Sequence, residues 1–155
     1  MAYEVQLLQL SEQPVASIVV PGIGADAVGA ALHGTLPDVF SHLQANGVAM
    51  VGAPFARYHA AADGGDRFDL EAGIPVGGSF PETDTIKART LPGGEAIATV
   101  HVGSYDRLED ALTALAAWRA EHGRSAAGAY WEIYEDDPSS TPPDEVRTRL
   151  VEPLA

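Results

Sequence analysis

A single acidic residue stands among aromatic residues in the segment Tyr130-Trp131-Glu132-Ile133-Tyr134. Side chains alternate between the two faces of a β-strand, so a strand here places Glu132 on one face between Tyr130 and Tyr134. Trp131 and Ile133 share the other face, which is suited to packing under a helix. A carboxylate is costly to bury unpaired, so the Glu132 face is interpreted as the wall of a groove. An apolar groove with one acid suits a flat, lipophilic cation, because aromatic faces attract cations.

An ordinary structural role for Glu132 stays open at this point. A glutamate in a strand is often turned to solvent or paired with an arginine of the next strand. Arg147 and Arg149 alternate along the segment that follows and are candidates for that pairing.

A second candidate group surrounds Gly103, in the segment His101-Val102-Gly103-Ser104-Tyr105. His101 could sense pH or accept a hydrogen bond from a ligand. A histidine at the end of a strand can equally fix a turn, and this alternative stays open. The other histidines are scattered without ligand spacing, and no serine lies in a nucleophile elbow. Neither a metal nor a cofactor is therefore predicted.

The elements that carry these residues repeat along the chain. In each half an apolar, β-branched run ending in glycine is preceded by a short strand and followed by an amphipathic helix and two more strands. The predicted elements are strands near 5–8, 15–22, 52–58 and 68–76 with a helix near 36–43, and strands near 86–90, 96–103, 128–134 and 146–154 with a helix near 106–123. Counted from the apolar run, the pattern is a β-α-β-β unit twice, each preceded by its short strand, with repeat one at about 3–78 and repeat two at about 84–154.

Several residues predict where the two helices begin and end. Pro37 fits a first helical position, and Gly47 suits the end of that helix. Asp106 and Glu109 have the spacing of a capping box for the second helix, and Gly123 suits its end.

Two such units pair because neither can bury its sheet alone. We predict one α+β domain over residues 1–155, with pseudo-twofold symmetry, antiparallel sheets, helices on one side and a ligand groove between the halves. Aligning the repeats matches Pro54, Ala56 and Tyr58 to Tyr130, Glu132 and Tyr134. The small Ala56 would leave space opposite Glu132. The predicted ligand-binding residues are Glu132, Tyr130, Tyr134, Tyr58, Ala56, Pro54, His101 and Trp131.

Composition narrows the possible partners. The formal net charge is −13, from 9 basic and 22 acidic residues. Nucleic-acid binding depends on clustered Lys and Arg, so direct binding to DNA or RNA is not expected, nor is docking to an anionic membrane. The absence of cysteine excludes disulfides and thiol catalysis. The N-terminus lacks the pattern of a secretory signal, and no stretch is long and apolar enough to span a bilayer, so a cytoplasmic protein is predicted.

The chain resembles the GyrI-like effector-binding family, which also supplies the ligand domains of multidrug-sensing transcription regulators. The resemblance rests on the duplicated plan, the segments 101–105 and 68–76, and Trp131-Glu132-Ile133-Tyr134 followed by Asp136-Asp137-Pro138. It covers about residues 3 to 154. It implies a groove for diverse lipophilic, often cationic compounds, with a central glutamate that Glu132 matches. Regulators of this family carry a preceding DNA-binding domain, whereas the repeat here begins within the first few residues, which argues against a transcription factor.

Three functions follow from these features. The leading one is a module that binds small lipophilic, cationic or aromatic compounds for sequestration or sensing. The alternative is a hydrolase of reactive small molecules, which the resemblance implies would use a Glu and a Tyr, here Glu132 and Tyr134. The third is an acidic protein-interaction or inhibitor module, for which the sequence offers no motif; a protein partner or a homodimer is compatible with it.

Overall fold

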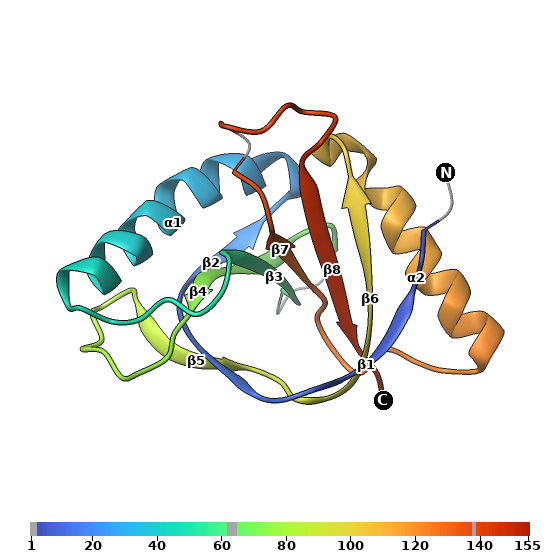
Figure 1. Cartoon of the computed structure of the whole chain (residues 1–155), viewed down its shortest axis with the longest axis horizontal. Coiled ribbons are helices and arrows are strands. Elements are labelled where there is room, and N and C mark those ends of the chain that lie inside the picture. Colours follow the sequence, from blue (N-terminus) through green and yellow to red (C-terminus); the bar gives the residue numbers. More distant parts are fainter. Residues whose placement is uncertain (1–2, 62–64, 138) are drawn as a thin grey trace. The chain divides into compact units, whose positions relative to one another are not determined.

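A computed structural model describes residues 3–61, 65–137 and 139–155, so Pro138 of the motif above lies outside the described residues. The described residues form eight strands, two α-helices and two short 3₁₀ helices (Figure 1). They divide into two compact units. Unit 1 comprises Met1–Ser11 and Gly93–Ala155, and unit 2 comprises Glu12–Pro92.

Unit 2 contains four antiparallel strands and one α-helix. Its elements are β2 (Gln13–Ile23), the 3₁₀ helix η1 (Ala25–Ala27), α1 (Val28–Ala45), β3 (Phe55–Ala60), β4 (Phe68–Pro75) and β5 (Lys87–Leu91). The strand order within the unit is β3-β4-β2-β5. Val39 and Leu43 of α1 pack on a core that includes Ala16, Ile18 and Ile74, which fixes the helix on one face of this sheet.

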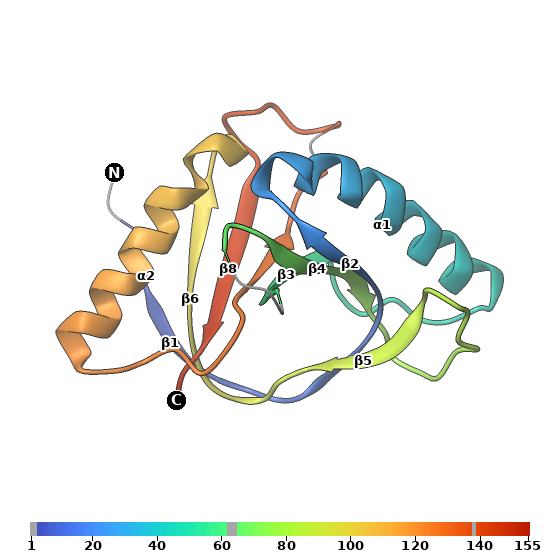
Figure 2. The same ribbon diagram turned by 180° about the vertical axis from the view of Figure 1, so that it is seen from behind.

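Unit 1 has the same composition of elements. They are β1 (Gln6–Leu10), β6 (Gly94–Val102), the 3₁₀ helix η2 (Tyr105–Arg107), α2 (Leu108–His122), β7 (Trp131–Tyr134) and β8 (Arg147–Pro153). The strand order is β1-β6-β8-β7, again antiparallel. Ala111 and Leu115 of α2 pack on Ile97 and Leu150. The helix therefore covers β6 and β8 on one face, as both views show (Figures 1 and 2).

The short strand that opens each predicted repeat pairs with partners from the other repeat. β1 pairs with β6, with Leu7 opposite Ile97, and β5 pairs with β2, with Ala88 opposite Ala16. Unit 1 is completed by a strand from the start of the chain, and unit 2 by a strand from beyond residue 84. This pairing is long-range, so hydrophobic periodicity within a repeat carries no signal for it.

The structure corrects two of the predicted helix boundaries. Helix α1 begins at Val28, so Pro37 lies inside the helix and not at its first position. The predicted Asp106–Glu109 capping box does not form at the start of α2. Asp106 lies in η2, and the N-cap residue of α2 is Arg107, which makes no side-chain capping hydrogen bond. Gly123 ends α2 as predicted, with a left-handed φ of 62°.

The predicted α+β class with antiparallel strands is confirmed. No helix in the described residues is sufficiently long and apolar to cross a bilayer.

Candidate functional site

Glu132 of β7 projects from the same side of the unit 1 sheet as α2, which packs on β6 and β8. Pairing with β8 sets Glu132 opposite Leu150 and Trp131 opposite Val151. Directly opposite residues project from the same face of a sheet, and Leu150 belongs to the core beneath α2, against which Tyr130 also packs. The prediction that Trp131 and Ile133 pack under a helix is therefore wrong. Alternation along a strand separates two sets of side chains, but it does not say which set faces the helix.

Glu132 is buried, with 4 % of its surface exposed. The Tyr134 hydroxyl donates to its Oε1 at 3.0 Å, and the Tyr130 hydroxyl lies 3.3 Å from its Oε2. The two arginines that offered a structural alternative pair elsewhere, Arg147 with Asp136 and Arg149 with Glu135. Glu132 is thus neither turned to bulk water nor paired with the arginines of the adjacent strand.

Tyr105 adds a third phenol ring to this site. Its ring meets that of Tyr134 edge to face, with centroids 6.0 Å apart. Burial raises the pKa of Tyr105, and the negative charge of Glu132 raises that pKa further. Because 41 % of Tyr105 is exposed, the ring lies at the rim of the site. The sequence singled out this tyrosine beside His101 but did not place it with Glu132, since the two are brought together only by the pairing of β6, β8 and β7.

Thr148 is a further polar residue on this face. It lies opposite Tyr134 on one side and opposite His101 on the other. Its side chain is fully buried, and its Oγ1 is the buried side-chain polar atom in the described residues that has no hydrogen-bond partner. No signal in the sequence distinguished this threonine from others at strand positions.

His101 is buried at 3 % exposure and both of its ring nitrogens are engaged. Nε2 lies 2.8 Å from the carbonyl oxygen of Ser104, which can only accept, so this nitrogen carries the proton. Nδ1 then accepts from the Tyr3 hydroxyl at 2.9 Å, and the Tyr3 ring stacks on the imidazole. This is the turn-fixing role that the sequence left open; a direct ligand contact by His101 stays a prediction.

Three predicted ligand residues belong to unit 2. Ala56 is fully buried in β3, Pro54 precedes that strand, and Tyr58 packs edge to face on Phe68. Their expected place across a groove from Glu132 stays a prediction, as does the groove itself.

A second buried carboxylate, which sequence reasoning missed, lies in unit 2. Glu71 is 4 % exposed, accepts from the Ser17 hydroxyl at 2.8 Å, and contacts His59 Nε2 at 2.8 Å. Arg89 donates to the Ser17 carbonyl and hydroxyl oxygens, which extends the chain of hydrogen bonds to β5. Burial lowers the pKa of Arg57, which lies directly opposite Glu71, and the Glu71 charge opposes that shift.

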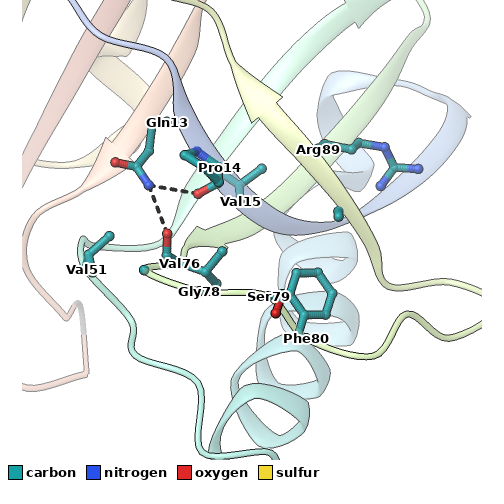
Figure 3. A pocket seen from close by; sticks show the side chains of 11 residues that line it. Gln13, Pro14, Val15, Val51, Val76, Gly78, Ser79, Phe80 and Arg89 are labelled. Atoms are coloured by element: carbon teal, nitrogen blue, oxygen red, sulfur yellow. Dashed lines mark hydrogen bonds between the residues drawn. The ribbon is translucent and has the colours of Figure 1, made fainter.

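A hollow in unit 2 coincides with neither carboxylate. It has a volume of about 520 Å³ and is bordered by residues such as Gln13, Val51, Val76 and Phe80 (Figure 3). The side-chain amide nitrogen of Gln13 donates hydrogen bonds to the carbonyl oxygens of Pro14 and Val76. A smaller hollow in unit 1, about 350 Å³, is bordered by Tyr3, Thr99 and Arg149. Neither hollow is bordered by Glu132 or by the tyrosines around it, Tyr105, Tyr130 and Tyr134.

The antiparallel α+β architecture agrees with that of a small-molecule-binding domain. The chain belongs to the GyrI-like family, since the model of the GyrI-like small molecule binding domain matches residues 3–155. The resemblance found in the sequence is thereby confirmed. A comparison with curated protein sequences found no match.

Solved structures share this fold. The EcmrR C-terminal domain superposes with a TM-score of 0.86 at 21 % identity, covering 100 % of this chain and 99 % of that one. SAV2435 bound to tetraphenylphosphonium has a TM-score of 0.65 at 13 % identity, covering 100 % and 94 %. A hydrolase from Listeria innocua has a TM-score of 0.65 at 13 % identity, covering 98 % and 92 %. Identities this low establish the fold alone.

Proposed function

We propose that this GyrI-like domain binds small lipophilic cations against the Glu132 carboxylate. The observation that carries the proposal is a glutamate at 4 % exposure whose two oxygens are approached by the hydroxyls of Tyr134 and Tyr130. Both phenol hydroxyls are hydrogen-bond donors to the carboxylate and help to hold it in place. The rings of the same residues, with that of Tyr105, present aromatic surface next to that charge.

Such a site selects its ligand by charge and by shape. A cation over an aromatic ring gains about 0.5–2 kcal/mol, with the larger value where water is excluded. An anionic compound of the same shape meets repulsion from Glu132 instead. The cation bound by the structurally similar SAV2435 is a suitable probe, because tetraphenylphosphonium combines four aromatic rings with one positive charge.

The test is a calorimetric or fluorescence titration of tetraphenylphosphonium into the wild type and Glu132→Gln. We expect the variant to bind about 10-fold to 100-fold more weakly, since a buried charge contact is lost while the shape is kept. Glu135→Gln is the matched control: it removes the same charge from an exposed residue just beyond β7 that pairs with Arg149. Its effect should be small and should disappear in moderate salt.

Tetraphenylborate, which has nearly the same shape and the opposite charge, provides the second control. We expect no binding of this anion by the wild type. Equal affinity of the wild type and Glu132→Gln for tetraphenylphosphonium would remove Glu132 from the proposal.

A hydrolase is the second candidate function. It is supported by the 3.0 Å contact of Tyr134 with Glu132, which pairs a proton donor with a carboxylate. Under this alternative Glu132 directs a water molecule at an electrophilic carbon and Tyr134 protonates the leaving group. Turnover of strained-ring compounds that disappears in both Glu132→Gln and Tyr134→Phe would support it. Recovery of such compounds unchanged after incubation with stoichiometric protein would exclude it for the compounds tested.

A further inference from the structure

We propose that His101 is a positioning residue that holds Tyr105 at the rim of the Glu132 site, with Tyr3 holding His101 in turn. The inference deepens the proposed function and rests on it for its ligand-binding test. It assigns a role in the site to Tyr3, a residue that precedes β1.

The contacts form one continuous path within unit 1. The Tyr3 hydroxyl donates to His101 Nδ1 at 2.9 Å, and His101 Nε2 donates to the Ser104 carbonyl at 2.8 Å. The residue after Ser104 is Tyr105, whose ring meets Tyr134, and the Tyr134 hydroxyl donates to Glu132 at 3.0 Å. Each step is a direct contact.

The Ser104 carbonyl connects this path of contacts to the backbone of η2. It accepts from His101 and also from the Arg107 amide at 3.3 Å, which closes the single turn of η2 that carries Tyr105. The preceding Gly103 has a φ of 123°, a value that favours glycine, and its amide donates to the Val146 carbonyl at 2.8 Å. The direction in which the chain enters η2 is thereby fixed from both sides.

The other side-chain contacts of η2 are exposed: the Ser104 hydroxyl donates to Asp106, and the Arg107 guanidinium donates to the Asp110 carboxylate at 2.9 and 3.1 Å. The turn has three residues, none of them buried, and its N-cap residue Ser104 makes no capping hydrogen bond to the backbone. A turn of this length is weak without tertiary contacts. The His101 imidazole differs from these exposed groups because it is buried, so its hydrogen bond to Ser104 is shielded from water.

The Tyr3 hydroxyl supports the tautomer that the Ser104 carbonyl selects. With Nδ1 accepting from the Tyr3 hydroxyl, the proton resides on Nε2, where it can be donated to Ser104. The stacked rings, with centroids 6.0 Å apart, also keep the imidazole plane fixed. Burial raises the pKa of Tyr3. The charge of Asp110, at the start of α2, raises that pKa further, and the charge of Arg107, at the end of η2, lowers it.

The test is a double-mutant cycle on tetraphenylphosphonium affinity with His101→Ala, Tyr105→Ala and the double variant. In the wild-type background His101→Ala should weaken binding about 5-fold to 10-fold, as expected for losing one hydrogen-bonded support. In the Tyr105→Ala background, His101→Ala should alter the affinity less than about 2-fold, because the Tyr105 ring that His101 positions has already been removed. Additive losses would overturn the proposal, since a general loss of stability acts in both backgrounds.

Conservative variants separate positioning from folding. His101→Gln keeps an amide donor for the Ser104 carbonyl and should restore most of the affinity. Tyr3→Phe removes only one hydroxyl and should give an intermediate loss, which supplies the same test if His101→Ala does not fold. No loss in Tyr3→Phe together with no rescue by His101→Gln would contradict the assigned path.

A ligand-free measurement distinguishes failure of this inference from failure of the proposed function. The ring-to-ring nuclear Overhauser contact between Tyr105 and Tyr134 should be present in the wild type and weakened in His101→Ala and Tyr3→Phe. An unchanged contact in folded variants would overturn the positioning role whatever the protein binds. A weakened contact with no tetraphenylphosphonium binding by the wild type would retain the positioning role and reject the proposed ligand class.

Discussion

At the scale of single residues, Glu132 and Glu71 show how a carboxylate is accommodated inside this protein. Each is 4 % exposed and each accepts from a hydroxyl group, of Tyr134 in one case and of Ser17 in the other. They differ in their surroundings: Glu132 is approached by aromatic rings, whereas Glu71 lies beside His59 and opposite Arg57. The aromatic surroundings are the reason to assign ligand binding to Glu132.

The ionisation of Tyr105 provides a test at this scale. Burial and then the Glu132 charge raise the pKa of Tyr105 above its ordinary value of 10.0 in the folded protein. The neutral phenol thus favours the folded state below pH 10, and this contribution is lost as the pH rises through the raised pKa. In Glu132→Gln the pKa of Tyr105 should move down towards 10, although burial keeps it raised.

A pH titration of the Tyr105 ring signals by NMR measures this shift, with Tyr105→Phe for assignment. Glu135→Gln should leave the pKa of Tyr105 where it is in the wild type. A Tyr105 pKa that is the same in Glu132→Gln and the wild type would place Glu132 outside the electrostatic reach of this ring.

At the scale of elements, β2 and β4 approach each other unusually closely in unit 2. Ser17 lies opposite Gly73, and a Cβ on Gly73 would lie 2.3 Å from the Ala16 carbonyl oxygen and 2.7 Å from the Ser17 Cβ. The obstacle is backbone in a central pair of strands, so it cannot move without disturbing the pairing. The same closeness brings Ser17 within hydrogen-bond distance of Glu71, two residues along β4.

We expect Gly73→Ala to lower the free energy of unfolding by about 1–3 kcal/mol, the typical cost of a forced overlap in a packed region. Gly78→Ala is the matched control, because a Cβ there meets nothing within 4 Å and the change should be within about 0.5 kcal/mol. Denaturant unfolding of both variants gives the two values. Equal stability of the two would show that β2 and β4 can separate without cost.

At the scale of the whole molecule, the boundaries of the units differ from those of the predicted repeats. Unit 2 ends at Pro92, beyond the predicted end of repeat one near 78, and its core includes Ile86 and Phe80. The first strand of the chain belongs to unit 1. Each compact unit therefore depends on a strand that lies outside the repeat in which its helix is encoded.

Fragments of the chain make this dependence measurable. A fragment of residues 12–92 contains all four strands of unit 2, whereas a fragment of residues 3–78 has β1 without its partner and lacks β5. We expect the first to show more secondary structure by circular dichroism and a more cooperative thermal transition. A fragment 3–78 that folds as well as 12–92 would mean that the strand exchange contributes little to stability.

Local patterns determined much of this protein from its sequence alone. Alternation along residues 130–134 correctly separated Tyr130, Glu132 and Tyr134 from Trp131 and Ile133, because the two-residue period of a strand is a local property. The apolar runs located β2, β6 and β8, and Gly123 marked the end of α2, for the same reason. The ordered set of these features sufficed to identify the family.

Tertiary structure decided everything that depends on which strand lies next to which. It set Leu150 beside Glu132 and so put the acid on the side of the sheet where α2 packs, and it brought Tyr105, Thr148 and Tyr3 to the same region of unit 1. It also gave β1 and β5 their partners and made α1 continuous through Pro37. Pairings across many tens of residues are selected by the packing of a complete core, and one sequence without its fold contains no local signal for them.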